Sequence, residues 1–219
     1  MNIQAAILDV DGTLLDSLSI WDTIGEDYLR SLGIVPRKDL SETIRDMSMA
    51  QAARYFQEEY HLDKSEPEII GGITQMLEDF YLNTVPLKPE AKELLAFLKE
   101  NRIRMTAATA TDRKLVQAAL KRNGVLEDFE RIFTCSEIGH GKDEPHIYEE
   151  AARFLQTKKE DILVFEDALY AIRTAKKAGF HTVAIYDCHE PDWETAGKEA
   201  DLSLKSSEDL EKLKKTLSN

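Results

Sequence analysis

Two carboxylates, Asp9 and Asp11, follow directly on the apolar residues 5–8 and lead into Gly12 and Thr13. Two neighbouring anions repel one another, and each of them resists leaving water. A segment that looks suited to burial therefore ends in a pair of charges that are costly to bury. We therefore expect a cation at this place and a chemical role for the two acids.

Other predicted strands also end in acids or hydroxyls. These ends are Thr109-Ala110-Thr111, Ser136-Glu137, Glu166-Asp167 and Asp187. Because ligands bind outside the carboxyl ends of parallel strands, the shared pattern predicts one polar site along that edge. For Asp187 alone we favour a helix-cap or turn role.

A magnesium ion suits this set of residues. The acids expected together are Asp9, Asp11, Glu166 and Asp167. Hard carboxylate oxygens are the ligands that Mg²⁺ prefers, and it takes few of them from the protein. Lys142, in the loop before a predicted helix that opens near Pro145, would bring a positive charge to the same place.

The elements that must position these residues alternate along the chain. Apolar runs at 5–10, 103–110, 131–136, 161–167 and 181–187 alternate with helical patterns at 89–101, 112–124, 145–156 and 168–179. Continuous apolar runs indicate strands that are buried on both faces, and Gly124 and Gly179 stand where helix C-caps are expected. The sequence predicts an α/β fold, a doubly wound parallel sheet covered by helices.

Residues 18 to about 85 break this alternation, since they contain helical patterns and no convincing strand. The first pattern, residues 19–33, places six apolar side chains on one side of a helix: Ile20, Trp21, Ile24, Tyr28, Leu29 and Leu32. Ser48 is a good N-cap for a second helix, and Ser65 with Glu68 forms a capping-box pattern for a third. We predict an inserted helical domain at 17–86 and a core domain at 1–16 plus 87–219.

The amino-acid composition restricts the kinds of binding partner and the cellular location to be expected. A formal net charge of −13 over 219 residues argues against nucleic acid or an anionic membrane as a main partner. The chain has no 18-residue apolar run and no signal-peptide pattern at its start, so we expect neither membrane insertion nor secretion. Two cysteines outside any CxxC pattern, Cys135 and Cys188, fit a reducing cytoplasm. We expect a cytoplasmic monomer.

The polar strand ends carry a family resemblance. Asp9-x-Asp11-Gly12-Thr13 resembles the first motif of the haloacid dehalogenase superfamily, and Thr109 resembles the second. Lys142-x-x-Pro145 resembles the third motif, and Glu166-Asp167 the fourth. The helical insert is similar to the small α-helical cap of β-phosphoglucomutase-like and phosphoglycolate phosphatase-like members. The resemblance implies a Rossmann-like core that acts on a small phosphorylated metabolite.

The resemblance also implies roles for individual residues. Asp9 would be the nucleophile in an aspartyl-phosphate mechanism, and Asp11 would move the proton of the leaving group and then of water. Mg²⁺ would be bound by Asp9, the backbone carbonyl of Asp11 and Asp167, with Glu166 as a ligand or an orienting neighbour. The remaining predicted contacts to phosphate or substrate are Thr109, Ala110, Lys142, the turn at Gly12, and Trp21 of the cap.

Asp9 and Asp11 are two residues apart, so on an extended chain both side chains would point to the same face. Their backbones would be about 6–7 Å apart, which leaves room for a phosphoryl group.

A phosphosugar mutase in the manner of β-phosphoglucomutase is an alternative function. Its cap histidine and arginine align by eye with Trp21 and Met49, which disfavours it. Receiver domains lack an acid placed like Asp11, and dehalogenase chemistry uses neither that acid nor a metal.

Overall fold

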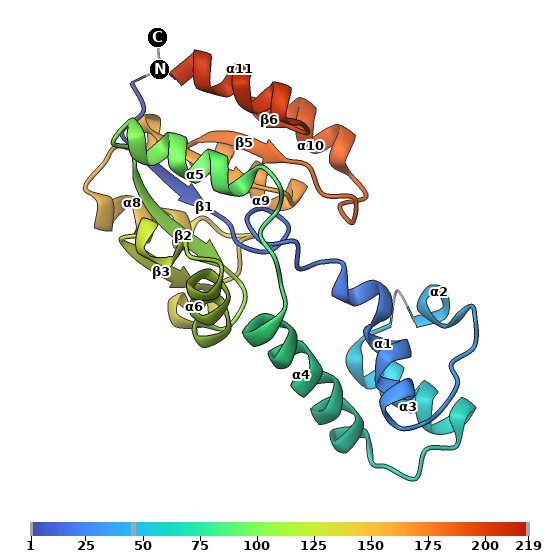
Figure 1. The fold of residues 1–219 in the computed structure, drawn as a ribbon. Helices are drawn as coiled ribbons and strands as arrows, with labels where there is room; N and C mark the ends of the chain where they lie inside the picture. The colour runs from blue at the N-terminus through green and yellow to red at the C-terminus, as the bar shows by residue number, and fades with distance from the viewer. Residues whose placement is uncertain (1, 45–46, 218–219) are drawn as a thin grey trace. The chain divides into compact units, whose positions relative to one another are not determined.

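A parallel sheet forms the centre of the larger part of the molecule (Figure 1). The computed structural model describes residues 2–44 and 47–217, and within them six strands are ordered β3-β2-β1-β4-β5-β6, every neighbouring pair parallel. The strands are β1 (Ala5–Leu8), β2 (Arg104–Thr109), β3 (Arg131–Thr134), β4 (Ile162–Glu166), β5 (His181–Ile185) and β6 (Leu202–Leu204). All residues of β1 and β4 are buried, as their unbroken apolar runs predict. The predicted fold class is confirmed.

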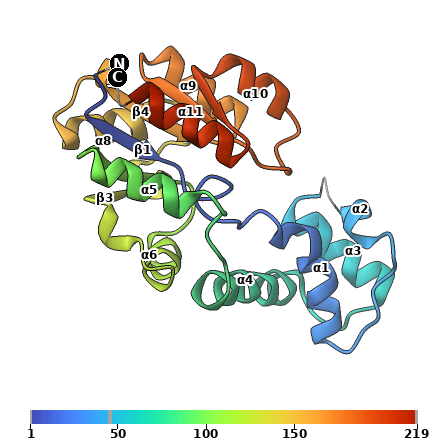
Figure 2. The same ribbon diagram turned by 45° about the horizontal axis from the view of Figure 1, so that its top comes forward.

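Helices cover both faces of this sheet (Figures 1 and 2). They are α5 (Ala91–Glu100), α6 (Arg113–Arg122), α7 (Cys135–Ile138), α8 (His146–Leu155), α9 (Leu169–Lys177), α10 (Trp193–Glu199) and α11 (Ser207–Leu217). On one face, Ile7 and Val164 of the sheet belong to a hydrophobic cluster with Ile147 and Tyr148 of α8. The alternation of side chains sends Leu8 to the opposite face. Gly124 and Gly179 follow α6 and α9 with φ of +76° and +97°, as expected of helix ends.

Two details of the predicted sheet are wrong. The edge strand β6 has only three residues, Leu202–Leu204, and such a short run leaves no readable pattern in the sequence. Strand β3 ends at Thr134 instead of continuing through Ser136, because a helical turn begins at Cys135. The Thr134 hydroxyl caps that turn by accepting the backbone N–H of Glu137 at 3.4 Å.

The chain folds into two compact units. We call them the core unit, which holds the chain up to Ser17 and from Val85 onward, and the helical unit, which holds Leu18–Thr84. The helical unit contains α1 (Ile20–Ser31), α2 (Leu40–Ile44), α3 (Met49–Tyr60) and α4 (Glu66–Asn83). Predicted N-terminal caps are present in it: Ser48 accepts from Gln51 N–H, and Glu68 accepts from the N–H of Ser65 at 2.8 Å.

The apolar side of α1 is narrower than the sequence pattern predicts. Ile24, Tyr28 and Leu29 are buried in the core of the helical unit, together with Phe56 of α3. Trp21, in contrast, is 52% exposed, and Leu32 is also exposed. The pattern places both on the same side as the buried residues, but Leu32 lies outside the core. For Trp21 the sequence also predicts a contact with substrate, and that stays a prediction. The exposed indole lies in the first turn of α1, two turns before the buried Tyr28.

In the part of the chain that the structure describes, no helix has the combination of length and apolar character needed to cross a bilayer.

Candidate active site

The strand order brings the predicted site residues to one edge of the sheet. β1 pairs with β2 on one side and β4 on the other, so Asp9 leaves β1 beside Thr109 at the end of β2 and Glu166 at the end of β4. The N–H of Asp9 donates to the carbonyl of Phe165 at 2.9 Å, which continues the sheet by one step. Ligand sites of doubly wound sheets lie at such a point, where successive connections leave in opposite directions.

Asp9 lies in a closed cluster of charged groups. We call this the acid cluster: Asp9, Lys142, Glu166 and Asp167, all buried. The Lys142 ammonium contacts an Asp9 carboxylate oxygen and donates to Glu166 at 2.8 Å. One carboxylate oxygen from each acid lies within 4.8 Å of the other two. Residues far apart in the sequence therefore meet within the reach of a single ion.

The charges in this cluster do not balance. Three carboxylates surround one ammonium, so the protein alone leaves an excess of negative charge in a buried place. Burial raises the pKa of Asp9 well above its ordinary range, against the attraction of Lys142, and raises the pKa of Asp167 to about 7. Burial opposes charge on Lys142 too, but Asp9 and Glu166 outweigh it and raise the pKa of that amine.

The same cluster fits a magnesium ion. One oxygen of Asp9, Oδ2, is buried and has no hydrogen-bond partner within the described part of the chain. A buried carboxylate oxygen without a donor is costly, and a cation would relieve the cost. The ligand atoms on offer are all carboxylate oxygens, which suit Mg²⁺ better than softer metals. Asp9 and Asp167 would bind the ion, whereas Glu166 already accepts a hydrogen bond from Lys142.

Asp11 has different surroundings. Its carboxylate accepts hydrogen bonds from the hydroxyls of Ser17 and Thr111, both at 2.8 Å, and from Thr109 at 3.3 Å. We call these four residues the hydroxyl cluster. The side-chain oxygens of Asp11 are outside the group of three acids that lie within 4.8 Å of one another. If Asp11 contributes to a metal site as predicted, it does so through its backbone carbonyl and not through its carboxylate.

A tight turn follows directly on the two acids. Gly12 has φ of +77°, a conformation that favours glycine, and its N–H donates to Leu15 at 3.0 Å. The Thr13 hydroxyl donates to Asp167 at 3.5 Å. This hydrogen bond links the turn to a residue 154 positions away, in the acid cluster.

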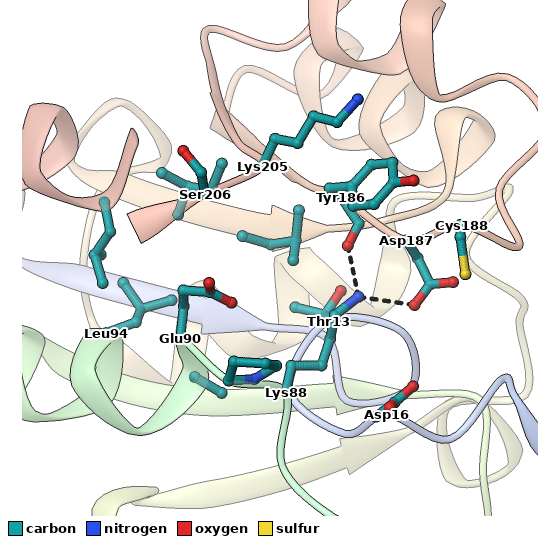
Figure 3. Close-up of a pocket in the computed structure, with 15 residues that line it drawn as sticks. Thr13, Asp16, Lys88, Glu90, Leu94, Tyr186, Asp187, Cys188, Lys205 and Ser206 are labelled. Atoms are coloured by element: carbon teal, nitrogen blue, oxygen red, sulfur yellow. Dashed lines mark hydrogen bonds and ion pairs between the residues drawn. The ribbon is translucent and has the colours of Figure 1, made fainter. Parts of the chain in front are cut away.

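Lys88 anchors this turn, and no pattern in the sequence indicates it. Its ammonium donates to the Gly12 carbonyl at 2.7 Å, to the Tyr186 carbonyl at 2.5 Å and to Asp187 at 2.7 Å (Figure 3). Burial works against charge on Asp187, but hydrogen bonds from Lys88 and His189 lower the pKa of its carboxyl. Asp187 thus forms an ion pair with Lys88 just after β5, and its carboxylate also accepts the N–H of His189 at 2.9 Å, which is the turn role that the sequence favours.

A cavity of about 260 Å³ lies next to this anchor (Figure 3). Leu94 of α5, Ile185 of β5 and Leu210 of α11 line it, and Lys88 and Thr13 also reach it. None of the four acid-cluster residues lines this cavity. It is therefore a hollow separate from the acid cluster.

Tyr148 is a second site neighbour that sequence reasoning missed. Its hydroxyl donates to Glu166 at 2.7 Å, and the side chain is fully buried. Burial, followed by the charge of Glu166, raises the pKa of this phenol well above its ordinary value. In the sequence, Tyr148 is one of several apolar positions on the inner side of α8, so only the fold reveals where its hydroxyl points.

Two predicted contact residues lie outside these clusters. Ala110 is exposed one residue beyond β2, and the exposed Trp21 belongs to the helical unit. Their predicted roles in substrate binding remain predictions.

Comparison with known proteins identifies the family. A sequence model described as haloacid dehalogenase-like hydrolase matches residues 3–179. The chain belongs to the haloacid dehalogenase-like hydrolases. This confirms the family that the four motifs predict.

Individual members of the family resemble the chain over most of its length. It is 23% identical to a phosphorylated carbohydrates phosphatase of Thermotoga maritima over 83% of this chain and 84% of that protein. It is 24% identical to hexitol phosphatase B of Escherichia coli (strain K12), with 84% and 83% covered. The fold matches a Thermotoga maritima crystal structure assigned as a β-phosphoglucomutase, with a TM-score of 0.86, 23% identity and 98% and 100% of the chains covered.

Proposed function

We propose that this haloacid dehalogenase-like hydrolase is a Mg²⁺-dependent phosphatase that uses Asp9 as its nucleophile. The observation that carries the proposal is the buried Oδ2 of Asp9, which has no hydrogen-bond partner among the described residues and lies next to an ammonium and two further carboxylates. This oxygen is available to a cation, and the carboxylate that carries it is the group that we propose attacks phosphorus. Magnesium, when bound, supplies positive charge that offsets repulsion between this carboxylate and the substrate phosphate.

The two clusters divide the chemistry between them. Asp9 attacks phosphorus, the bond from phosphorus to the ester oxygen breaks, and Asp11 gives a proton to the departing alcohol. In the second step Asp11 takes a proton from water, the water oxygen bonds to phosphorus, and the bond to Asp9 breaks to release phosphate. Lys142 and the Thr109 hydroxyl stabilise the phosphoryl oxygens during both steps.

A phosphorylated sugar or sugar alcohol is the proposed substrate class. Support comes from the relatives, which are named as phosphatases of phosphorylated carbohydrates and of hexitols. We further propose that the helical unit is a cap that selects the substrate, with the exposed Trp21 as one of its contacts. An exposed indole offers a sugar ring an apolar face and one hydrogen-bond donor.

The test is phosphate release from a panel of hexose phosphates, hexitol phosphates and an aryl phosphate, with Mg²⁺ or with a chelator. We expect activity that depends on Mg²⁺ and falls by at least about 10³-fold in Asp9→Asn. Asp63→Asn, an exposed carboxyl of the helical unit, is the matched control and should leave activity unchanged. Full activity in Asp9→Asn would contradict the proposal, and interconversion of hexose phosphates without phosphate release would favour the mutase.

A further inference from the structure

Two groups of potential metal ligands lie outside the acid cluster in the described part of the chain, and one of them, Asp187 to His189, follows β5. The other lies in and after the loop that joins α7 to α8. We call it the histidine triad: His140, Glu144 and His146. The Nδ1 atom of His140 is hydrogen-bonded to Oε2 of Glu144, and Nε2 of His146 lies 3.9 Å from the same oxygen. The two imidazole rings have centroids 4.1 Å apart and are tilted by 44°.

The spacing of these atoms is close to that of a metal site. The three ligand atoms lie within 4.8 Å of one another. With bonds of about 2.0–2.2 Å, the ligand atoms of a tetrahedral zinc ion are about 3.4 Å apart. The observed spacing between His146 and Glu144, 3.9 Å, is therefore somewhat wider than that of bound ligands, and the three side chains are on the surface, where they can rotate.

The chemistry of the triad differs from that of the acid cluster. Imidazole nitrogens suit Zn²⁺ and its neighbours in the first transition row, whereas Mg²⁺ favours oxygen alone. Two histidines and one glutamate form a known protein ligand set for zinc, with water in the fourth position. The side chains are 46%, 51% and 46% exposed, so an ion has access to the triad from solvent, and water can complete its coordination.

The backbone of the loop is already held in place. The N–H of Glu144 donates to the Gly141 carbonyl at 3.3 Å, and the Thr174 hydroxyl of α9 donates to the Asp143 carbonyl at 3.3 Å. An ordered loop loses little conformational entropy when an ion binds, which favours affinity. His140 and Glu144 also flank Lys142, the buried cation of the acid cluster.

We propose that the histidine triad binds a Zn²⁺-type divalent ion, separately from the Mg²⁺ proposed for the acid cluster. The ion joins the two ends of the segment that carries Lys142. Zinc binding therefore stabilises this loop and the start of α8. The proposal does not depend on the phosphatase activity, since it concerns ion binding by a different set of residues.

Calorimetric titration of the whole protein with Zn²⁺, in excess Mg²⁺ that occupies the oxygen ligands, tests this proposal. We expect one zinc ion per chain, and an affinity at least tenfold lower in the double variant His140→Ala/His146→Ala. Glu144→Gln should also weaken binding, since the amide is a poorer ligand than the carboxylate. His61→Asn, an exposed histidine at the end of α3 with φ of +51°, is the matched control and should bind zinc like the wild type.

Two further measurements separate this site from other zinc binding. Co²⁺ bound by the triad should give a visible absorption band that persists in Asp9→Asn and is absent in the double histidine variant. Thermal unfolding should shift upward with Zn²⁺ in the wild type and not in the double variant. Equal zinc affinity in the wild type and the double variant would overturn the proposal. Zinc binding that appears only together with dimer formation, measured by light scattering, would also overturn a site within one chain.

Discussion

Asp9 and Asp11 have the same side chain and stand two residues apart, yet the fold gives them opposite surroundings. Asp9 is 5% exposed and contacts the ammonium of Lys142, and one of its oxygens has no donor in residues 2–44 and 47–217. Asp11 accepts hydrogen bonds from three hydroxyl groups in a place that is only partly buried. The environment, rather than the residue type, therefore distinguishes the two neighbouring carboxyls.

The backbone is the source of this difference. Asp9 still follows the line of β1, since its N–H donates to Phe165 in β4, so its side chain enters the buried edge of the sheet. Asp11 belongs to the following turn, where it forms a bridge with Leu15. A short step beyond the strand is therefore enough to move a carboxyl from a charged, closed cluster into a cluster of hydroxyls.

Replacing each acid by its amide should have the largest effect on activity, and the two variants should fail at different steps. Asp11→Asn keeps an oxygen that accepts from Ser17 and Thr111, but it removes the proton carrier. With an aryl phosphate, whose leaving group needs no proton, we expect Asp9 to become phosphorylated and turnover to slow by about 10²–10⁴-fold. Rapid-quench kinetics should show a burst of aryl alcohol and a phosphorylated protein, whereas Asp9→Asn should show neither. Wild-type turnover in Asp11→Asn would remove the distinction between the two acids.

The acid cluster alone should make stability depend on pH in the absence of metal. The folded protein raises the pKa of Asp167 to about 7 from an ordinary value of 3.8. A raised pKa means that the folded state binds the proton more tightly, so this stabilisation is complete below about pH 4 and is lost as pH rises to about 7. In a chelator, we expect the free energy of unfolding to fall by up to about 4 kcal/mol between pH 4 and pH 8.

Urea unfolding at several pH values measures this dependence. Mg²⁺ should remove most of the loss, because it binds the ionised carboxylates, so the stabilisation by Mg²⁺ should be larger at pH 8 than at pH 5. Asp167→Asn should flatten the pH dependence in chelator. The same slope in Asp167→Asn and in the wild type would assign the titration to other groups.

The sequence predicts the acid cluster better than it predicts the anchoring of the turn at Gly12 that follows the two acids. Asp9, Lys142, Glu166 and Asp167 follow strands or precede a helix, and the order of a doubly wound sheet is enough to bring them together. The contacts of Lys88 could not be predicted in this way. Its partners are two backbone carbonyls and a carboxyl 99 residues away, and a carbonyl has no signature in the sequence.

Helix patterns were informative about burial only in part. The period of α1 correctly predicts the buried Ile24, Tyr28 and Leu29, but it also includes Trp21, which is 52% exposed. Periodicity reports which side of a helix is apolar, whereas the extent of the neighbouring surface decides how much of that side is covered. The three-residue β6 was missed because pairing with β5, rather than its own residues, makes it a strand.

Lys88→Met tests whether the turn at Gly12 holds the carboxyls of Asp9 and Asp11 in position. The variant removes all three anchoring hydrogen bonds and leaves the buried Asp187 with His189 as its remaining partner in these contacts. We expect a loss of about 1–3 kcal/mol in the free energy of unfolding. We also expect a fall of about tenfold in kcat, because the Gly12 turn positions both carboxyls.

Lys99→Met is the matched control for this prediction, since Lys99 is 66% exposed and pairs with Asp128 at the surface. It should change stability by less than about 0.5 kcal/mol and leave kcat unaltered. If Lys88→Met lowered stability as expected but left kcat unaltered, the turn would be a structural anchor with no part in positioning the acids.

The smallest expected effect comes from Tyr148→Phe, which tests how the buried surroundings of Asp9 depend on the position of Glu166. The variant removes one hydrogen bond of 2.7 Å to Glu166 and leaves that carboxyl to Lys142, with about 1–2 kcal/mol lost from the free energy of unfolding. Since Glu166 then competes for Lys142 with Asp9, the affinity for Mg²⁺ should fall by up to about tenfold. Titration of activity with Mg²⁺ measures this, and Tyr55→Phe, a partly buried tyrosine of α3 in the helical unit, should behave like the wild type. An unchanged Mg²⁺ requirement in Tyr148→Phe would mean that Glu166 is positioned by Lys142 alone.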